Sequence, residues 1–187
     1  MSVMDTLVFD DVAQWDAWLA EHYAQGIGVW LRIARRESGG VGVTIREAGD
    51  VALCYGWIDS QRKRLDEHYF LQRYSPRRTG AAWSRVNVER IEALLAGGRM
   101  REPGLAEVRA AQADGRWAAA YPPQREASVP REVAALLQAN ERARRSFEAL
   151  GKTQRYLLLL PVLKARTATA RTAQLQAVLR KLDAAPE

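Results

Sequence analysis

Cysteine and histidine are scarce in this chain of 187 residues, which holds one cysteine and two histidines. A single cysteine, Cys54, excludes an internal disulfide and fits a reducing compartment. The two histidines are His22 and His68. Together with Cys54 they do not form the ligand spacing that is typical of a zinc site. We therefore predict a cytoplasmic protein without a structural metal.

Long apolar runs are also missing. The longest, residues 157–163, is far below the ~20 residues that cross a bilayer, so no membrane span is expected. Residues 1–5 lack the basic region followed by an apolar stretch that marks a signal peptide. Walker, GxGxxG and GxSxG motifs and paired catalytic carboxylates are absent, so we predict no cofactor. The composition that remains, 48% hydrophobic and 27% charged, is typical of a globular protein.

Charge is distributed unevenly along the chain, whose formal net charge is +6. Residues 1–60 carry 4 basic and 9 acidic side chains, whereas residues 61–101 carry 10 basic and 4 acidic ones. Arginine supplies 24 of the 28 basic residues. Guanidinium groups suit carboxylate and phosphate recognition, so the 61–101 segment predicts contact with an anion. Scattered arginines elsewhere are equally explained by genome composition.

Periodicity and capping signals in the first two thirds predict helices mixed with strands. Helices are expected from Asp10 or Asp11 to Gly26, from Thr44 to Gly56, from Ser84 or Asn87 to Gly97, and from Leu105 to Asp114. Strands are expected at residues 7–9, 27–35, 57–65 and 68–75, the last two forming a hairpin. We thus predict an α+β fold with a small antiparallel or mixed sheet packed against helices.

A proline-rich stretch separates this region from the last third. Residues 122–130 contain three prolines, which resist regular structure. Beyond it four helical patterns follow, the third kinked or restarted at Pro161. The sequence therefore predicts an α+β domain at 1–121, a linker at 122–130 and a C-terminal helical module at 131–187.

One stretch, from residue 54 to residue 87, concentrates side chains that bind ligands. Aromatic rings next to guanidinium groups can form stacking pockets. Alternation along a strand places Arg62 and Arg64 on one face, and Arg73 is expected opposite them, which would make an anion site. The candidate ligand-binding residues are Trp57, Asp59, Arg62, Arg64, Arg73, Arg77, Arg78, Trp83 and Asn87. The simpler interpretations are that the tryptophan rings only fill the core and that the arginines form a solvated basic face.

Several of these residues have a structural alternative. Asn87 is either a helix cap or a pocket donor. Asp59 is either a general base or the partner of an arginine, and pairing would keep its pKa low. Cys54 is a nucleophile only if it is accessible and its pKa is lowered, and its place near a helix end favours burial. No catalytic residue is predicted.

The order of the motifs resembles that of a known bacterial family. These motifs are Ala52–Asp59, Tyr69–Arg78, Trp83–Asn87, Gly98–Met100 and Asp114–Trp117. They resemble the YdeI/OmpD-associated (OmdA) family of bacteriocin-protection proteins, and the similarity extends over nearly the whole chain from Trp15. The resemblance implies a role in tolerance of bacteriocins and cationic antimicrobial peptides.

The C-terminal part resembles that family's helical module. There the last loop usually carries an Ala-Lys pair, a Thr-Arg pair and further arginines. Lys164 and Arg171 stand in place here, whereas Leu163 replaces the alanine and Ala168-Thr169 occupies the Thr-Arg position. The resemblance implies a basic loop in this module that is altered in this chain.

Three functions are consistent with the sequence. The first is a cytoplasmic stress or tolerance protein with an aromatic and arginine pocket for a small anionic ligand. The second is a nucleic-acid-binding protein that uses the basic 61–101 region. The third is an enzyme built around Asp59, Arg77 and Cys54, for which no set of acid, base and nucleophile can be assembled. A protein partner is a further candidate, and the oligomeric state is left open.

Overall fold

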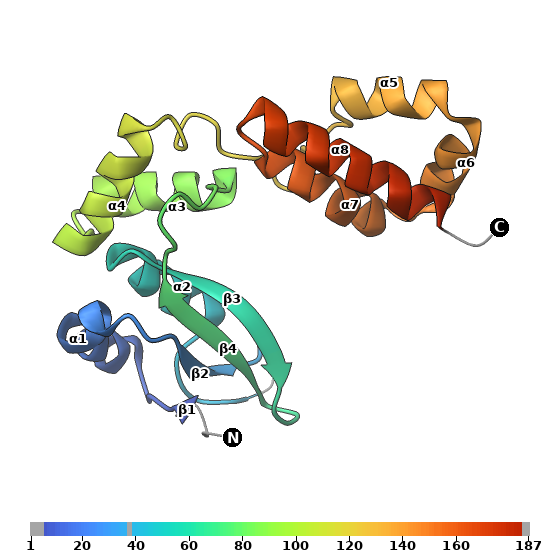
Figure 1. The fold of residues 1–187 in the computed structure, drawn as a ribbon. Helices are drawn as coiled ribbons and strands as arrows, with labels where there is room; N and C mark the ends of the chain where they lie inside the picture. The colour runs from blue at the N-terminus through green and yellow to red at the C-terminus, as the bar shows by residue number, and fades with distance from the viewer. Residues whose placement is uncertain (1–5, 37–38, 185–187) are drawn as a thin grey trace. The chain divides into compact units, whose positions relative to one another are not determined.

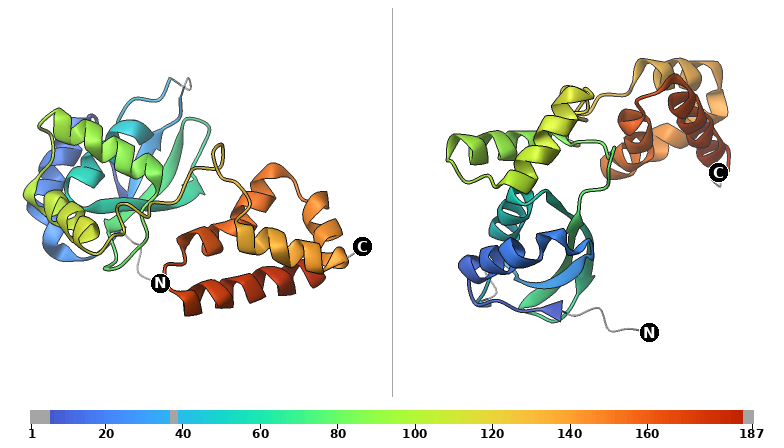
Figure 2. Two further views of the ribbon diagram at one scale, coloured as in Figure 1. Left: turned by 90° about the horizontal axis from the view of Figure 1, so that it is seen from above. Right: turned by 60° about the vertical axis from the view of Figure 1, so that its left-hand side comes forward.

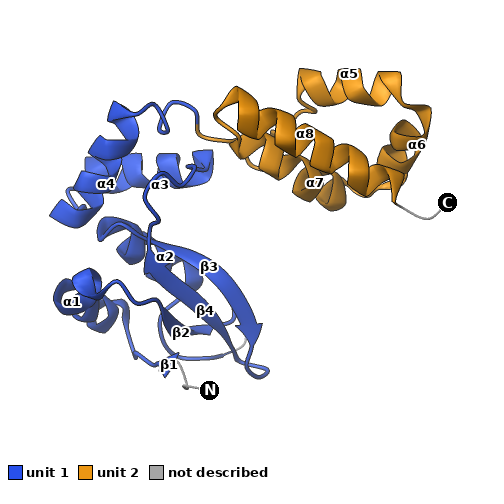
Figure 3. Ribbon diagram, in the orientation of Figure 1, with its two compact units in different colours: residues 1–119 blue, residues 120–187 orange. Residues whose placement is uncertain are grey.

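The computed structural model describes residues 6–36 and 39–184, which form two compact units, unit 1 (residues 1–119) and unit 2 (residues 120–187) (Figures 1 and 3). Unit 1 combines a mixed four-stranded sheet with helices, and unit 2 is entirely helical (Figure 2). The predicted α+β fold with a C-terminal helical region is therefore confirmed. No helix within the described ranges is long and apolar enough to cross a membrane.

The sheet of unit 1 has the strand order β1-β2-β4-β3. Its strands are β1 (Thr6–Leu7), β2 (Val29–Ala34), β3 (Trp57–Arg64) and β4 (Tyr69–Pro76). β1 pairs parallel to β2, whereas β4 pairs antiparallel to both β2 and β3. The β3–β4 hairpin closes at Asp66, whose side chain accepts hydrogen bonds from the backbone N–H groups of His68 and Tyr69. Because β3 comes last in the strand order, it is an edge strand.

Three helices of unit 1 begin at a polar residue whose side chain caps them. The helices of this unit are α1 (Val12–His22), the short 3₁₀ helix η1 (Tyr23–Gln25), α2 (Ile45–Cys54), α3 (Arg85–Ala96) and α4 (Glu102–Ala113). Asp11 caps α1, and Thr44 forms a capping box with Glu47 at the predicted start of α2. Gly26 ends η1 with a φ of 72°, a left-handed conformation that favours glycine.

Helix α4 starts at Glu102, three residues before the predicted start. Pro103 stands in its first turn, where the missing N–H costs no hydrogen bond, because first-turn N–H groups have no intrahelical acceptor. Gly104 then lies against the end of α2, and a Cβ at this position would overlap the Cys54 carbonyl oxygen. The Glu-Pro-Gly sequence, which is typical of turns, therefore begins a helix here and allows close helix packing.

The core of unit 1 is rich in aromatic rings, since all six tryptophans of the chain lie in it. Trp15 of α1 is fully buried, and its ring centroid lies 5.7 Å from that of Tyr74. Its indole N–H donates to the Ala48 carbonyl of α2 at 3.1 Å. Leu31 and Ile33 of β2 are also fully buried. Through these contacts α1 and α2 are held together against one face of the sheet, and α3 and α4 pack on α2 (Figure 1).

Unit 2 packs four helices around an aliphatic core. The helices are α5 (Arg131–Ala139), α6 (Glu141–Ala149), α7 (Lys152–Lys164) and α8 (Ala168–Asp183). Val133, Phe147, Val162 and Val178 are among its buried residues. The proline-rich stretch belongs to this unit, where the Tyr156 hydroxyl donates to the Pro122 carbonyl at 3.1 Å.

Helix α7 continues through Pro161, where we expected a kink or a restart. A proline leaves the carbonyl four residues earlier without its usual donor, and that carbonyl belongs to Leu157. The Leu157 residue is 59% exposed, so water has access to this point of the helix.

Candidate functional site

The arginines predicted to form one anion site lie on two faces of the sheet. Arg62 is in register with Gln72 and Arg64 with Phe70, whereas Arg73 follows Gln72 and so points to the opposite face, next to Trp30. The Arg62 Nε donates to the Gln72 Oε1 at 3.0 Å. The structure therefore brings Arg62 near β4 but separates both β3 arginines from Arg73.

The basic run on β3 has a structural explanation. Arg62, Lys63 and Arg64 are exposed and lie on an edge strand. Charged side chains on an edge oppose pairing with strands of other chains. The Lys63 ammonium lies over the Trp30 ring, 4.3 Å from its centroid. Both side chains are on the face of the sheet that carries Arg73.

Trp57 and Trp83 are core residues, each 1% exposed. The Trp57 indole N–H donates to the Tyr23 carbonyl at 3.1 Å. The Arg77 guanidinium lies 3.7 Å from the centroid of Trp83 and donates to the Ala82 carbonyl at 2.7 Å, so it clamps the loop after β4. Arg78, by contrast, is exposed.

Asn87 and Asp59 do not join these residues in a pocket. The Ser84 hydroxyl oxygen caps α3 by accepting from the Asn87 backbone N–H at 3.2 Å, so Asn87 is not the cap. Asp59 is an exposed residue of β3. The predicted site residues are thus divided among the sheet faces, the core and the surface.

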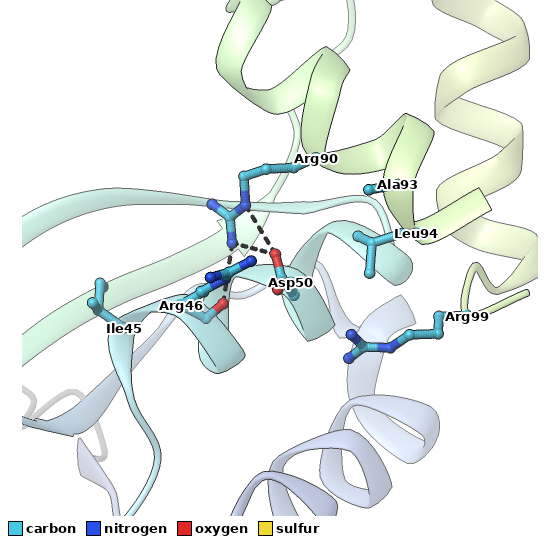
Figure 4. A pocket seen from close by; sticks show the side chains of 7 residues that line it. All are labelled: Ile45, Arg46, Asp50, Arg90, Ala93, Leu94 and Arg99. Atoms are coloured by element: carbon cyan, nitrogen blue, oxygen red, sulfur yellow. Dashed lines mark hydrogen bonds and ion pairs between the residues drawn. The ribbon is translucent and has the colours of Figure 1, made fainter. Parts of the chain in front are cut away.

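A cavity of about 500 Å³ lies elsewhere in unit 1, between α2 and α3 (Figure 4). It is lined by Ile45, Arg46, Asp50, Arg90, Ala93, Leu94 and Arg99. Three of these seven side chains are guanidinium groups and one is a carboxylate. We take this cavity, called the α2–α3 cavity below, as the candidate functional site.

Arg90 is held in a fixed position on the wall of this cavity. Its Nε and Nη2 both donate to the Asp50 Oδ1, at 2.9 and 2.6 Å, and Nη2 also donates to the Arg46 carbonyl at 3.1 Å. Gly49 makes room for it, since a Cβ there would lie 2.6 Å from the Arg90 Nη2. A glycine inside a helix costs about 1 kcal/mol relative to alanine, and here it lets a guanidinium lie directly on α2.

Arg46 and Arg99 have no ionic partner among the residues that the structure describes. Within residues 6–36 and 39–184, neither guanidinium forms a hydrogen bond or ion pair with a side chain or backbone group. Figure 4 shows Arg46 on α2 beside Asp50, and Arg99 extending from the turn after α3 into the same space. With Arg90 offset by Asp50, the cavity keeps an excess of two positive charges. Such an arrangement binds anions through charge-assisted hydrogen bonds.

Sequence reasoning missed this site because its residues are far apart in the chain. Arg90 and Arg99 belong to the basic 61–101 segment, but Arg46 and Asp50 come from the acidic N-terminal third. The available signal was Gly49, which interrupts a helix between buried positions. A glycine at such a position indicates a close approach by another group.

Other chemistry receives little support from the described residues. No group of three or more His, Cys, Asp or Glu side chains there could hold a metal ion. Cys54 is buried, and burial raises the pKa of its thiol, which keeps it protonated at neutral pH. A protonated thiol is a poor nucleophile.

Comparison with known proteins gives two matches, one in each unit. Residues 7–107 match a family model described as a domain of unknown function (DUF8412). Residues 126–184 match the model described as bacteriocin-protection, YdeI or OmpD-associated (OmdA). The motifs from Ala52 to Met100 lie inside the first model, so the match to the second is confined to unit 2. No curated protein and no solved structure matches the chain.

Proposed function

The chain belongs to the DUF8412 family through residues 7–107 and carries an OmdA domain at residues 126–184, and from this premise we propose that it is a cytoplasmic tolerance protein whose unit 1 binds a small anion. The observation that carries the proposal is the presence in the α2–α3 cavity of two guanidinium groups, Arg46 and Arg99, that have no ionic partner among the described residues. The tolerance role rests on the description of the OmdA family alone.

A small anion fits the charges of the cavity better than a cationic peptide does. The chain has a formal net charge of +6, so it repels cationic antimicrobial peptides at long range. The α2–α3 cavity combines Arg46, Arg99 and the fixed Arg90 with the apolar side chains of Ile45, Ala93 and Leu94. A few charged groups within an otherwise apolar concavity are typical of small-ligand sites.

The experiment titrates the full-length protein with inorganic phosphate and sulfate by calorimetry, at low and high salt. Thermal midpoints measured in parallel rise with a ligand that binds the native state. Replacing both Arg46 and Arg99 by alanine should weaken binding at least tenfold, because a hydrogen bond to a charged group contributes roughly 1.5–3 kcal/mol.

The matched control replaces Arg62 and Arg64 by alanine, which removes the same charge from the exposed edge strand. This variant should bind phosphate and sulfate as the wild type does. Equal weakening in both double variants, or no binding in the wild type, would show that the α2–α3 cavity is not an anion site.

A nucleic-acid-binding function is the second candidate, and the exposed cations of β3 favour it. Arg62, Lys63 and Arg64 form a basic row on the edge strand, and Lys63 lies over Trp30. Binding of a mixed single-stranded oligonucleotide should then weaken steeply with salt. The same two double variants distinguish the functions, since only the loss of Arg62 and Arg64 should affect the oligonucleotide.

A further inference from the structure

Unit 2 contains a cavity of its own, of about 450 Å³, between α6, α7 and the proline-rich stretch. The stretch contributes Gln124, Ala127 and Val129 to the lining, and the end of α6 contributes Phe147 and Leu150. Its volume falls within the range of small-molecule sites. We call it the α6–α7 cavity.

The remaining wall of this cavity is one face of α7. Lys152, Arg155, Tyr156 and Leu159 line it, and a spacing of three, four and seven residues places them on the same side of a helix. The two cations stand in the first turns of α7, and Leu159 follows Lys152 by about 10 Å at a rise of 1.5 Å per residue. The wall therefore changes from charged to apolar along the helix.

The proline-rich stretch is fixed against α7 by hydrogen bonds. The Gln124 Nε2 donates to the Thr153 hydroxyl oxygen at 3.1 Å, and the Tyr156 hydroxyl donates to the Pro122 carbonyl at 3.1 Å. Three prolines restrict the backbone of residues 122–130, which reduces the entropy lost when the stretch is held in place. The stretch is therefore an ordered wall of the cavity.

Both charges that line the cavity are positive. Lys152 has no ionic or hydrogen-bond partner among the residues that the structure describes. The Arg155 guanidinium donates to three backbone carbonyls, which do not neutralise it. The carboxylates closest in sequence to the lining, Glu126 and Glu148, pair with arginines outside it. An anionic group is therefore complementary to this cavity.

The rest of the lining is mainly apolar. Val129 is 41% exposed, and Ala127 and Leu150 are partly exposed, so these side chains offer apolar surface to a ligand. Phe147 and Leu159 are buried in the core of unit 2, which closes the cavity on that side. An apolar group that enters the cavity therefore leaves water for an apolar surrounding, which favours its binding.

We propose that the α6–α7 cavity binds a small monocarboxylate with a compact aliphatic chain. The carboxylate lies at Lys152 and Arg155, and the chain extends toward Leu159 beside Val129 and Leu150. The Arg155 Nε and Nη2 already donate to carbonyls, which leaves Nη1 and the Lys152 ammonium for the two oxygens of one carboxylate. The inference goes beyond the function proposed above, since it concerns the other unit and another class of ligand.

The experiment titrates the full-length protein with butyrate, hexanoate and octanoate by calorimetry. The affinity should rise along this series, by roughly fourfold for each methylene that the cavity covers. The neutral 1-octanol should bind more weakly than octanoate, because it cannot form charge-assisted hydrogen bonds with two cations. An affinity that does not depend on chain length, or no binding of octanoate, would show that the inference is wrong.

The variant Lys152→Met tests the position of the carboxylate. It removes the ammonium and keeps an unbranched side chain that suits a helix. Octanoate should bind at least about tenfold more weakly, because a hydrogen bond between charged groups is lost, whereas 1-octanol should not be weakened. The matched control is Lys181→Met, which removes the same charge from an exposed position of α8 and should leave octanoate binding unchanged. Equal weakening in both variants would assign the effect to net charge and overturn the inference.

The variant Ala127→Leu tests the position of the chain. It fills the α6–α7 cavity from the proline-rich stretch and should weaken octanoate and 1-octanol alike, with helical ellipticity unchanged. Octanoate binding that persists in this variant, or that is lost only when Arg46 and Arg99 are replaced, would place the ligand elsewhere and contradict the inference. Phosphate binding should not depend on Lys152, so the failure of either proposal leaves the other standing.

Discussion

The two units use arginine in different ways. In unit 1, two guanidinium groups are buried: Arg77 is 8% exposed and stacks on Trp83, and Arg116 is 3% exposed and donates to the Ala81 carbonyl. In unit 2, a guanidinium group closes the end of a helix. Arg155 donates to the carbonyls of Phe147, Glu148 and Leu150 at the end of α6.

This difference follows from how each unit is built. Unit 1 has a sheet and large rings, whose flat faces accept guanidinium groups at short range. Unit 2 contains two helices of nine residues, α5 and α6, and helices this short are marginal without help from packing and caps. Buried arginines therefore stabilise loops and rings in unit 1, Arg155 stabilises a helix end in unit 2, and the candidate site is built from guanidinium groups of unit 1.

The largest effect is expected from removing a ring in unit 1. Trp83→Ala should lower the free energy of unfolding by about 4 kcal/mol, because it deletes the surface under Arg77 and the contact with Trp117 at 5.0 Å. Urea denaturation followed by circular dichroism measures this loss. Val86→Ala, at an exposed position of α3, should change the value by less than about 0.5 kcal/mol. A loss below about 1 kcal/mol for Trp83→Ala would refute the central role of the ring.

A smaller effect is expected from crowding the closest helix contact of unit 1. Gly104→Ala should cost about 2 kcal/mol, because the new methyl group overlaps the Cys54 carbonyl and α4 must move away from α2. Gly97→Ala serves as the control, since its Cβ would lie 3.4 Å from the nearest atom and its φ of −83° suits alanine. The same denaturation measurement applies, and equal values for the two variants would show that the contact is not tight.

In unit 2, the largest polar contribution should come from a helix end. Arg155→Met should lower the free energy of unfolding by about 1.5 kcal/mol, because it removes three hydrogen bonds to the last carbonyls of α6 while keeping most of the apolar stem. Arg145→Met, on the exposed side of α6, should have almost no effect. If both variants behave alike, helix ends do not limit the stability of unit 2.

The smallest effect concerns the ion pair between Arg171 and Glu132. The hydrogen bond from Arg171 lowers the pKa of Glu132, so the pair contributes stability above the unfolded pKa of a glutamate and loses it as the pH falls through the folded value. Arg171→Gln should raise the pKa of Glu132, measured by nuclear magnetic resonance. Arg180→Gln, on the exposed part of α8, should leave that pKa unchanged, and a shift in both variants would point to general charge instead.

Local signals in the sequence are sufficient to predict most of the fold. The capping box at Thr44 and Glu47, the hairpin turn at Asp66 and the cap at Asn140 each act over three or four residues, so they can be read without a structure. The start of α4 differs from the prediction because proline and glycine are typical turn residues. Only packing against α2 shows why they stand in a helix.

The candidate site is much harder to predict. Alternation along β3 correctly placed Arg62 and Arg64 on one face, but the register of β4 decides which face carries Arg73. The α2–α3 cavity joins residues 46 and 50 to residues 90 and 99, a juxtaposition that depends on the packing of two helices. Periodicity gives each helix its buried face, but it does not reveal which helix covers that face.

The placement of the six tryptophans divides the protein optically as well as structurally. Because all of them lie in unit 1 and unit 2 contains only tyrosines and a phenylalanine, fluorescence excited selectively at the indole band reports on unit 1 alone. Helical ellipticity, by contrast, includes the contribution of the four helices of unit 2. Recording both signals on the unmodified chain therefore distinguishes the unfolding of unit 1 from that of unit 2, without any label.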